Sequence, residues 1–402
     1  MRKLRFLITL LAFGIAAPGW SQESGPSNMR VRKCDPSHHP TKGHCVSAIV
    51  FGSTRNHPTS GFSGAEIYLM TMNEDGTFNV DDAARLTQDE IGINGFVGAN
   101  LFPKLSPEGK RIVFDSNRNR LPSEPGNTSD LFLMKADGKA QTLLIRGSSA
   151  TWSPNGKYIA FHRSASGTGL PIKPDPGAAT ADSDIFIMRV PDLDGNVIEE
   201  PINITNTLLF IEDDADWSPD GQKIVFTRHP TTDPAGNSPN AEICEVTLET
   251  LDVTCLTNNG EEERGPTWSP DGTRIAYMCR NQTTSIFDIC VMDADGAGQT
   301  HLTDNSVLPQ EDRFHATPTW SPDGTKIVFT RGPAQTNAQL WVINADGPAG
   351  ETPLPHDSTL TQGVNTTASW GQLWVGGRRL RHQQRHFADG EVLRIEPSGD
   401  TR

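Results

Sequence analysis

Three segments of the chain are dense in carboxylates: FIEDDADW at 210–217, NNGEEERGPTW at 258–268 and LPQEDRFHATPTW at 308–320. Clustered carboxylates with an imidazole nearby can bind a divalent cation such as Ca²⁺, or a basic segment of another protein. An acidic surface without a ligand would have the same composition, and both interpretations stay open. The candidate binding residues are Glu212, Asp213, Asp214, Asp216, Glu262, Glu263, Glu311, Asp312 and His315.

Six cysteines offer either metal ligation or disulfide formation. They fall into three successive pairs, and the two members of each pair are eleven residues apart. Metal sites more often use ligands about two to four residues apart, whereas an even number of cysteines in an exported chain is typical of a disulfide framework. The spacing therefore predicts three local disulfides: Cys34–Cys45, Cys244–Cys255 and Cys279–Cys290.

The first residues of the chain predict export. A basic start, MRKLR, is followed by the apolar run 6–17 and then by small residues near Ser21. This order is typical of a secretory signal peptide, and the run is too short to span a bilayer. No cysteine lies at its end, so a lipid anchor is not expected. We predict a signal peptide over 1–22, no membrane span, and a periplasmic or extracellular location.

The sequence lacks the motifs of several enzyme classes. It contains no G-x-S-x-G elbow, no H-E-x-x-H motif and no glycine-rich phosphate loop. His162, His229 and His315 could still hold a metal ion together with carboxylates. A metal-assisted carbohydrate lyase or lactonase is therefore the alternative to a non-enzymatic binding protein. The formal net charge of −14 disfavours nucleic acid as a partner.

The elements that must position these residues form a repeat. A W-S-P-D-G-type turn followed by an apolar stretch occurs five times, at 104–118, 151–164, 216–229, 267–280 and 319–332. In this turn Ser caps backbone N–H groups, Pro pre-sets φ, and Gly accepts a positive φ. The Ile-Val-Phe-type strand that follows is apolar at consecutive positions, which predicts burial on both of its faces.

Each repeat unit adds a third strand, such as DIFIMRV at 184–190, and a short fourth strand that contains Leu-Thr or Ile-Thr. Four strands in about fifty residues are typical of a β-propeller blade. The N-terminal region from 47 onwards supplies three strands of a blade without its first strand, and NTTASWG at 365–371 is a first strand without successors. We predict an all-β, six-bladed propeller of four-stranded antiparallel blades, in which the C-terminal strand joins the N-terminal blade and leaves no open edge.

In this frame the acidic segments connect one blade to the next and would ring the mouth of the central channel. An arginine also recurs at the end of each second strand, which predicts a structural role in which it pairs with carboxylates. These arginines are Arg55, Arg118, Arg163, Arg228, Arg280 and Arg331.

The W-S-P-D-G turn, the I-V-F strand and the D-I-x-V-M-x-A-D-G strand at 288–296 resemble the repeats of TolB and TolB-like periplasmic propeller proteins. The resemblance spans 46–371 and lacks the N-terminal α/β domain of TolB itself. It implies an exported scaffold that binds a protein or peptide in the periplasm or cell envelope. We expect a signal peptide at 1–22, a lead-in at 23–45, the propeller at 46–371 and a tail at 372–402. We also expect a monomer, a partner of basic character and no required cofactor, with Ca²⁺ as a candidate cation at the channel mouth.

Overall fold

A computed structural model describes most of the chain between 43 and 376. The described residues are 43–55, 64–73, 76–88, 98–119, 129–163, 183–191, 199–207, 210–230, 241–281, 283–308, 315–332, 338–347, 352–354 and 365–376. The predicted signal peptide, most of the lead-in, most of the tail, and Cys34, Glu311 and Asp312 lie outside these ranges.

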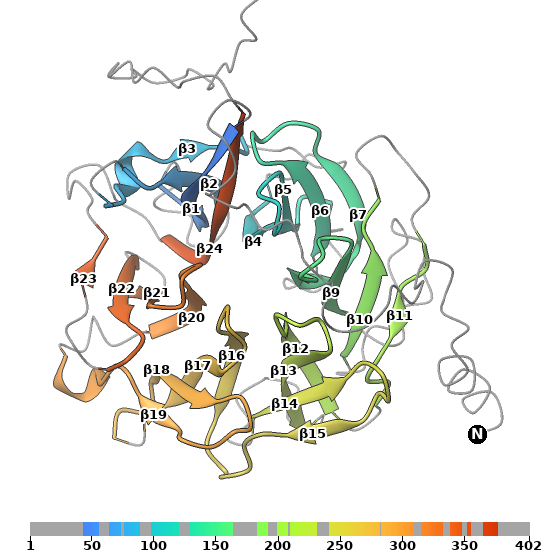
Figure 1. Cartoon of the computed structure of the whole chain (residues 1–402), viewed down its shortest axis with the longest axis vertical. Helices are drawn as coiled ribbons and strands as arrows, with labels where there is room; N and C mark the ends of the chain where they lie inside the picture. Colours follow the sequence, from blue (N-terminus) through green and yellow to red (C-terminus); the bar gives the residue numbers. More distant parts are fainter. Residues whose placement is uncertain are drawn as a thin grey trace, which may run out of the picture.

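Six four-stranded antiparallel sheets surround a central axis as the blades of a propeller (Figure 1). From the axis outward, blade 1 consists of β24 (Asn365–Gly376), β1 (Gly43–Ser53), β2 (Glu66–Thr71) and β3 (Ala84–Arg85). Blade 2 consists of β4 (Asn100–Leu105), β5 (Arg111–Ser116), β6 (Asp130–Lys135) and β7 (Thr142–Arg146). Blade 3 consists of β8 (Ser148–Trp152), β9 (Tyr158–Arg163), β10 (Asp184–Arg189) and β11 (Ile202–Asn203).

Blades 4 to 6 complete the ring. Blade 4 consists of β12 (Phe210–Trp217), β13 (Lys223–Pro230), β14 (Glu242–Thr247) and β15 (Val253–Cys255). Blade 5 consists of β16 (Glu263–Trp268), β17 (Arg274–Arg280), β18 (Phe287–Asp293) and β19 (Thr300–His301). Blade 6 consists of β20 (His315–Trp320), β21 (Lys326–Arg331), β22 (Gln339–Asn344) and β23 (Thr352–Pro353). Two 3₁₀ turns, η1 (Val80–Asp82) and η2 (Asn305–Val307), lie in connections.

The ring is closed as predicted, because the last described strand completes the first blade. β24 pairs with β1 in antiparallel register, with Trp370 opposite Ile49 and Gly376 opposite Gly43. The Trp370 indole donates a hydrogen bond of 2.8 Å to Ser47 Oγ. The paired strands extend a few residues beyond the expected limits of 46 and 371 at both ends.

The repeated turn has the hydrogen bonds that its sequence predicts. In blade 4, Ser218 Oγ donates to Asp220 Oδ1 over 2.6 Å and accepts from the Lys223 amide over 2.9 Å. Gly221 takes a φ of +73°, which an L side chain rarely adopts. The turns of blades 5 and 6 repeat this arrangement at Ser269 and Ser321.

The second strand of each blade is buried on both faces, also as predicted. On β13, Ile224 and Phe226 pack in a cluster with residues of blade 3, whereas Val225 packs in a cluster with Trp268 and Tyr277 of blade 5. Alternate residues of one strand thus belong to two interfaces, and the apolar core consists of layers between blades.

The tryptophans at the ends of the inner strands differ in their hydrogen bonding, which leads to a test of the packing. Trp320 Nε1 donates to Thr267 O over 3.0 Å, whereas the buried Trp268 Nε1 has no hydrogen-bond partner. We expect Trp320→Phe to lower the free energy of unfolding by about 1 kcal/mol more than Trp268→Phe, because only the first change removes a hydrogen bond that a buried indole donates. Urea denaturation of both variants measures the difference, and equal losses would contradict it.

None of the described elements is a helix that is long and apolar enough to cross a membrane.

Candidate functional site

The predicted acidic residues that the structure describes lie on or beside the inner strands, and not in free loops. Glu212, Asp213, Asp214 and Asp216 belong to β12. Glu263 and His315 are the first residues of β16 and β20, and Glu262 immediately precedes β16. These residues therefore lie on neighbouring blades 4, 5 and 6 close to the axis (Figure 1).

Glu212, Glu263 and His315 occupy equivalent positions and are buried, with exposed fractions of 0%, 1% and 0%. The amides of Glu212 and Glu263 donate to the carbonyls of Ser183 and Ala241, which lie just before the third strand of the preceding blade. We call these positions the blade joints. Because all three side chains are buried, a binding partner cannot contact them in this structure.

Glu212 and Arg228 form a buried ion pair within blade 4. Arg228 donates to Glu212 Oε1 from Nη2 over 2.6 Å and from Nε over 2.9 Å. Burial raises the pKa of Glu212, and the charge and hydrogen bonds of Arg228 offset this only in part. The pairing of this arginine with a carboxylate was predicted from the repeat.

At the next blade joint two carboxyl groups meet. Burial, with a smaller contribution from the nearby carboxylate of Glu242, raises the pKa of Glu263 to about 7 against hydrogen bonds from Asn259 and Thr257. The Asn259 amide donates to Glu263 Oε1 over 2.7 Å, and Thr257 Oγ1 donates to Glu242 Oε2 over the same distance. The pair is stable when one carboxyl group keeps its proton.

The other recurring arginines also have structural contacts. Arg118 and Arg163 stack on Phe132 and Phe186, with 4.2 and 4.4 Å between the guanidinium carbon and the ring centroid. Glu262 accepts from Arg264 over 2.6 Å and from Arg280. Glu262 is therefore neutralised in place.

Asp216 is likewise a structural residue. Its Oδ1 accepts from Thr151 over 2.8 Å, and its Oδ2 accepts from Thr267 Oγ1 and the Trp268 amide over 3.0 and 2.9 Å. This carboxylate joins blades 3, 4 and 5. Of the predicted acidic residues that the structure describes, Asp213 and Asp214 are the two that are neither buried at a blade joint, nor paired with an arginine, nor hydrogen-bonded to both neighbouring blades.

One residue of each inner strand lies in a bulge with a positive φ of 48° to 59°. At each bulge the pairing between the first and second strands shifts register. Such a bulge points a side chain away from the regular alternation of the strand. We call this set the axial ring: Phe102, Ser149, Asp214, Gly265, Thr317 and Thr367.

Charged side chains gather on one half of the axial ring. We call Asp115, Ser149, His162, Asp213 and Asp214 the axial cluster, which is contributed by blades 2, 3 and 4. Asp115 accepts from the Ser149 amide over 3.0 and 3.1 Å and from Ser148 Oγ. Asp213 Oδ2 lies 3.5 Å from His229 Nε2, while Asp213 Oδ1 and His162 Nδ1 are buried atoms without a hydrogen-bond partner.

Among the described residues, no lysine or arginine forms an ion pair with a carboxyl group of the axial cluster, and the one basic group within ion-pair distance is His229 beside Asp213. Burial, with a smaller contribution from the charge of Asp214, raises the pKa of Asp115 to about 7 against hydrogen bonds from Ser148 and Ser149. Burial and the charge of Asp213 raise the pKa of Asp214, against the weaker effects of the His162 and Arg264 charges and of a hydrogen bond from Ser149. A cation that entered here would favour the ionised form of both groups.

Sequence reasoning missed Asp115. It follows the aromatic residue of the I-V-F strand, where the equivalent residues of four other blades are Gly52, His162, Thr227 and Thr330. A charged residue at this place in the repeat was the available signal. Its partner, Ser149, belongs to the next blade, and only the closed ring brings the two together.

The geometry offers no three-ligand metal site in the axial cluster. Within the part of the chain that the structure describes, three ligand atoms approach within 4.8 Å of one another at Cys279, Cys290 and His301. Of the histidines considered for a metal, His162 belongs to the axial cluster and His229 lies beside it, whereas His315 contacts Thr303 and Asp288.

Two of the predicted disulfides are present. Cys244 on β14 is bonded to Cys255 on β15, and Cys279 on β17 is bonded to Cys290 on β18. Each bond joins adjacent antiparallel strands, as expected. Cys34–Cys45 includes a residue outside the described ranges and stays a prediction.

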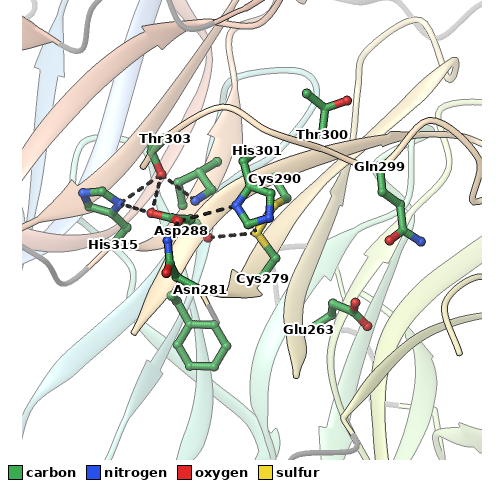
Figure 2. The surroundings of a disulfide bond; sticks show 12 residues. Glu263, Cys279, Asn281, Asp288, Cys290, Gln299, Thr300, His301, Thr303 and His315 are labelled. Carbon is green, nitrogen blue, oxygen red and sulfur yellow. Dashed lines mark hydrogen bonds and ion pairs between the residues drawn. A yellow bond between two sulfur atoms is a disulfide. The ribbon is translucent and has the colours of Figure 1, made fainter. Parts of the chain in front are cut away.

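A polar cluster surrounds the second disulfide (Figure 2). His301 Nδ1 lies 3.7 Å from Cys279 Sγ and 3.5 Å from Asp288 Oδ2. Although burial alone would raise it, hydrogen bonds from His301, His315, Asn281 and the Asn305 amide hold the pKa of Asp288 well below its usual range. The hydrogen bond to Asp288 in turn raises the pKa of His301, against the effect of burial.

Comparisons with known proteins agree with this architecture. Residues 178–374 match the family model of the TolB beta propeller domain. The Tol-Pal system protein TolB of Francisella tularensis subsp. tularensis (strain WY96-3418) is 26% identical over 233 residues, which cover 57% of this chain and 46% of TolB. The chain thus spans about half the length of the curated relatives that it matches.

Solved structures show the same fold. TolB from Acinetobacter baumannii superimposes with a TM-score of 0.55 at 19% identity, over 81% of this chain and 66% of that one. A putative TolB from Agrobacterium tumefaciens gives a TM-score of 0.50 at 16% identity, over 83% of this chain and 99% of that one. The chain is a TolB-like β-propeller.

Proposed function

We propose that this TolB-like propeller is an exported, non-enzymatic scaffold that binds a protein or peptide of basic character through the axial cluster. It would do so in the periplasm or outside the cell, as the N-terminal sequence predicts. The observation that carries the proposal is the set of Asp115, Asp213 and Asp214, which are buried or half-buried near the axis and form no ion pair with a described lysine or arginine.

A basic side chain from a partner would supply the charge that the cluster lacks. A Lys or Arg that reaches Asp213 and Asp214 would exchange repulsion between carboxylates for attraction in a partly desolvated site. The protonated fraction of Asp115 and Asp214 would fall on binding, so protons would leave the complex near pH 7. The surrounding acidic charge would also speed the encounter with a basic partner.

The variant that tests the proposal is Asp213→Asn with Asp214→Asn. Asn tolerates the left-handed conformation of residue 214, so the bulge should persist. The matched control is Glu249→Gln with Asp252→Asn, which removes the same charge from an exposed turn at the outer edge of blade 4. Each protein would be used to capture partners from a cell-envelope fraction by cross-linking.

We expect the parent and the control to capture the same partner. The axial variant should capture at least about tenfold less of it, since a desolvated charge pair contributes about 2 kcal/mol or more. Calorimetry of the captured partner in two buffers of different ionisation enthalpy should show protons released by the parent. Equal capture by both variants would place the binding surface elsewhere. A parent that captures nothing and carries a bound divalent metal would point to the enzymatic alternative.

A further inference from the structure

The disulfide of blade 5 has a third potential metal ligand beside it, on a neighbouring strand. Cys290 on β18 lies directly opposite His301 on β19, and Cys279 on β17 is bonded to Cys290 from the other side. One ligand atom from each of the three residues lies within 4.8 Å of the other two. Three hydrogen-bonded strands hold these atoms, so their positions are fixed by the sheet (Figure 2).

The separations suit a tetrahedral zinc ion. With Zn–S of about 2.3 Å and Zn–N of about 2.0 to 2.1 Å, an ideal tetrahedron has an S···N edge of about 3.6 Å and an S···S edge of about 3.8 Å. The observed distance from Cys279 Sγ to His301 Nδ1 is 3.7 Å. Once the S–S bond is broken, the two sulfurs are no longer bonded and must move apart, toward the S···S separation of about 3.8 Å that a zinc tetrahedron requires.

The surroundings favour a cation at this place. Asp288 Oδ2 lies 3.5 Å from the same His301 nitrogen, and its side chain is buried within five polar contacts. The carboxylate therefore adds negative charge beside the three ligands. His301 is 51% exposed on the outermost strand of the blade, which provides a path for an ion from solvent.

We propose that blade 5 carries a redox-gated zinc site, in which Cys279, Cys290 and His301 bind one Zn²⁺ when their disulfide is reduced. The reductant is a dithiol. Its first thiolate attacks one sulfur and forms a mixed disulfide; its second releases the protein thiol, so the reductant leaves as a disulfide and both cysteines gain a proton.

Zinc binding then completes the site. Zn²⁺ displaces the two thiol protons to solvent, and neutral His301 donates the lone pair of Nδ1 while its proton stays on Nε2. The two thiolates balance the charge of the ion, which limits the cost of burying it. Asp288 lies outside the group of three, so the described residues supply three ligands and a water molecule would be the fourth.

The chain contains its own control. Cys244 and Cys255 are also eleven residues apart and also join adjacent strands. Within the described residues, no third ligand atom forms a group with them. A reduced pair without an imidazole should bind zinc far more weakly.

The experiment compares two double variants that each retain one described pair. Cys244→Ser with Cys255→Ser retains the proposed site, and Cys279→Ser with Cys290→Ser retains the control pair. Each is reduced by a dithiol and freed of excess reductant without oxygen. Each is then titrated with Zn²⁺ against a chelator of known affinity, while far-UV circular dichroism follows the fold. Co²⁺ replaces Zn²⁺ in a parallel titration, because thiolate ligation gives it a charge-transfer absorption.

We expect one ion per chain at the proposed site, with thiolate-to-cobalt absorption, and a loss of affinity of at least about tenfold on adding His301→Gln. The control pair and the oxidised protein should not bind at the same concentrations. Equal binding by both pairs, an affinity that His301→Gln leaves unchanged, or binding by the oxidised protein would overturn the proposal. So would a reduced site variant that loses its fold and does not recover it with zinc.

Discussion

Ending the chain before Asn365 is expected to abolish the folded monomer. β24 is the innermost strand of blade 1 and pairs with β1 over ten residue positions. Its Trp370 packs edge-on against Phe78, with 5.4 Å between ring centroids, and joins the cluster of Ile49 and Phe51. Without β24, β1 becomes an open edge and the inner strands of blades 2 and 6 lose a neighbour.

The free energy contributed by the lost contacts is expected to exceed the net stability of a typical domain. Typical domains are stable by about 5 to 15 kcal/mol, and the loss of one fully buried aromatic side chain costs about 3 to 5 kcal/mol. Removing β24 removes the half-buried Trp370, the buried Ala368 and all of the pairing with β1. We expect the truncated chain to aggregate or to unfold without a cooperative transition. Size-exclusion chromatography and thermal unfolding measure both. The matched control ends after Gly376 and should elute and melt like the parent, since it keeps the whole strand. A cooperative, monomeric protein lacking β24 would show that the ring does not depend on its closure.

Replacing Glu263 by Gln is expected to make the protein more stable above neutral pH. The ordinary pKa of 4.5 is raised to about 7 in the folded protein, chiefly by burial. A carboxyl group that binds its proton more tightly when folded stabilises the fold at low pH. The stability that it contributes is full below pH 4.5 and is lost as the pH rises through 7.

The magnitude follows from the size of this change. One pH unit of pKa shift corresponds to about 1.4 kcal/mol, so Glu263 can cost the parent up to about 3 kcal/mol at pH 8 relative to acidic conditions. Gln resembles the protonated form: it can accept from Asn259 and donate to Glu242. Asp115 acts with the same sign between pH 3.8 and 7, so the variant should lose only part of the parent's pH dependence.

Urea denaturation at several pH values between 5 and 8 provides the measurement. The free energy of unfolding of the parent should fall over this range by more than that of Glu263→Gln. Glu249→Gln, which removes an exposed carboxylate of blade 4, is the control and should follow the parent. A lower free energy of unfolding for Glu263→Gln than for the parent at pH 8 would mean that the folded protein stabilises the ionised carboxylate.

The sequence predicts the fold because the repeat encodes local structure. The Ser-Pro-Asp-Gly turn predicts a two-strand unit by its own hydrogen bonds, and Ile-Val-Phe predicts a strand covered on both sides. Three strands at one end and one at the other predict the closure that β24 makes with β1. The two described disulfides followed from spacing once the strands were assigned.

The axial cluster was harder to predict because its residues meet across blades. Glu212 and Glu263 were expected at a channel mouth, but they lie on inner strands and are buried at blade joints. Asp216 was expected to bind a ligand, but it bridges three blades. A pattern within one repeat gives the strand of a residue. Which residue of the next blade it faces depends on the packing of the ring.

The axial ring gives the fold a way to change its chemistry without changing its framework. Each of its six residues sits in a bulge, where the regular pairing of the inner and second strands is already interrupted. A mutation there exchanges a side chain near the axis and leaves the turns, the apolar layers and the blade joints as they are. Phe102, Asp214 and Thr317 show how widely the position varies within a single chain. Descendants of one ancestral propeller can therefore diverge in ligand preference by point mutations at six equivalent places, within the set of residues that tolerate a positive φ.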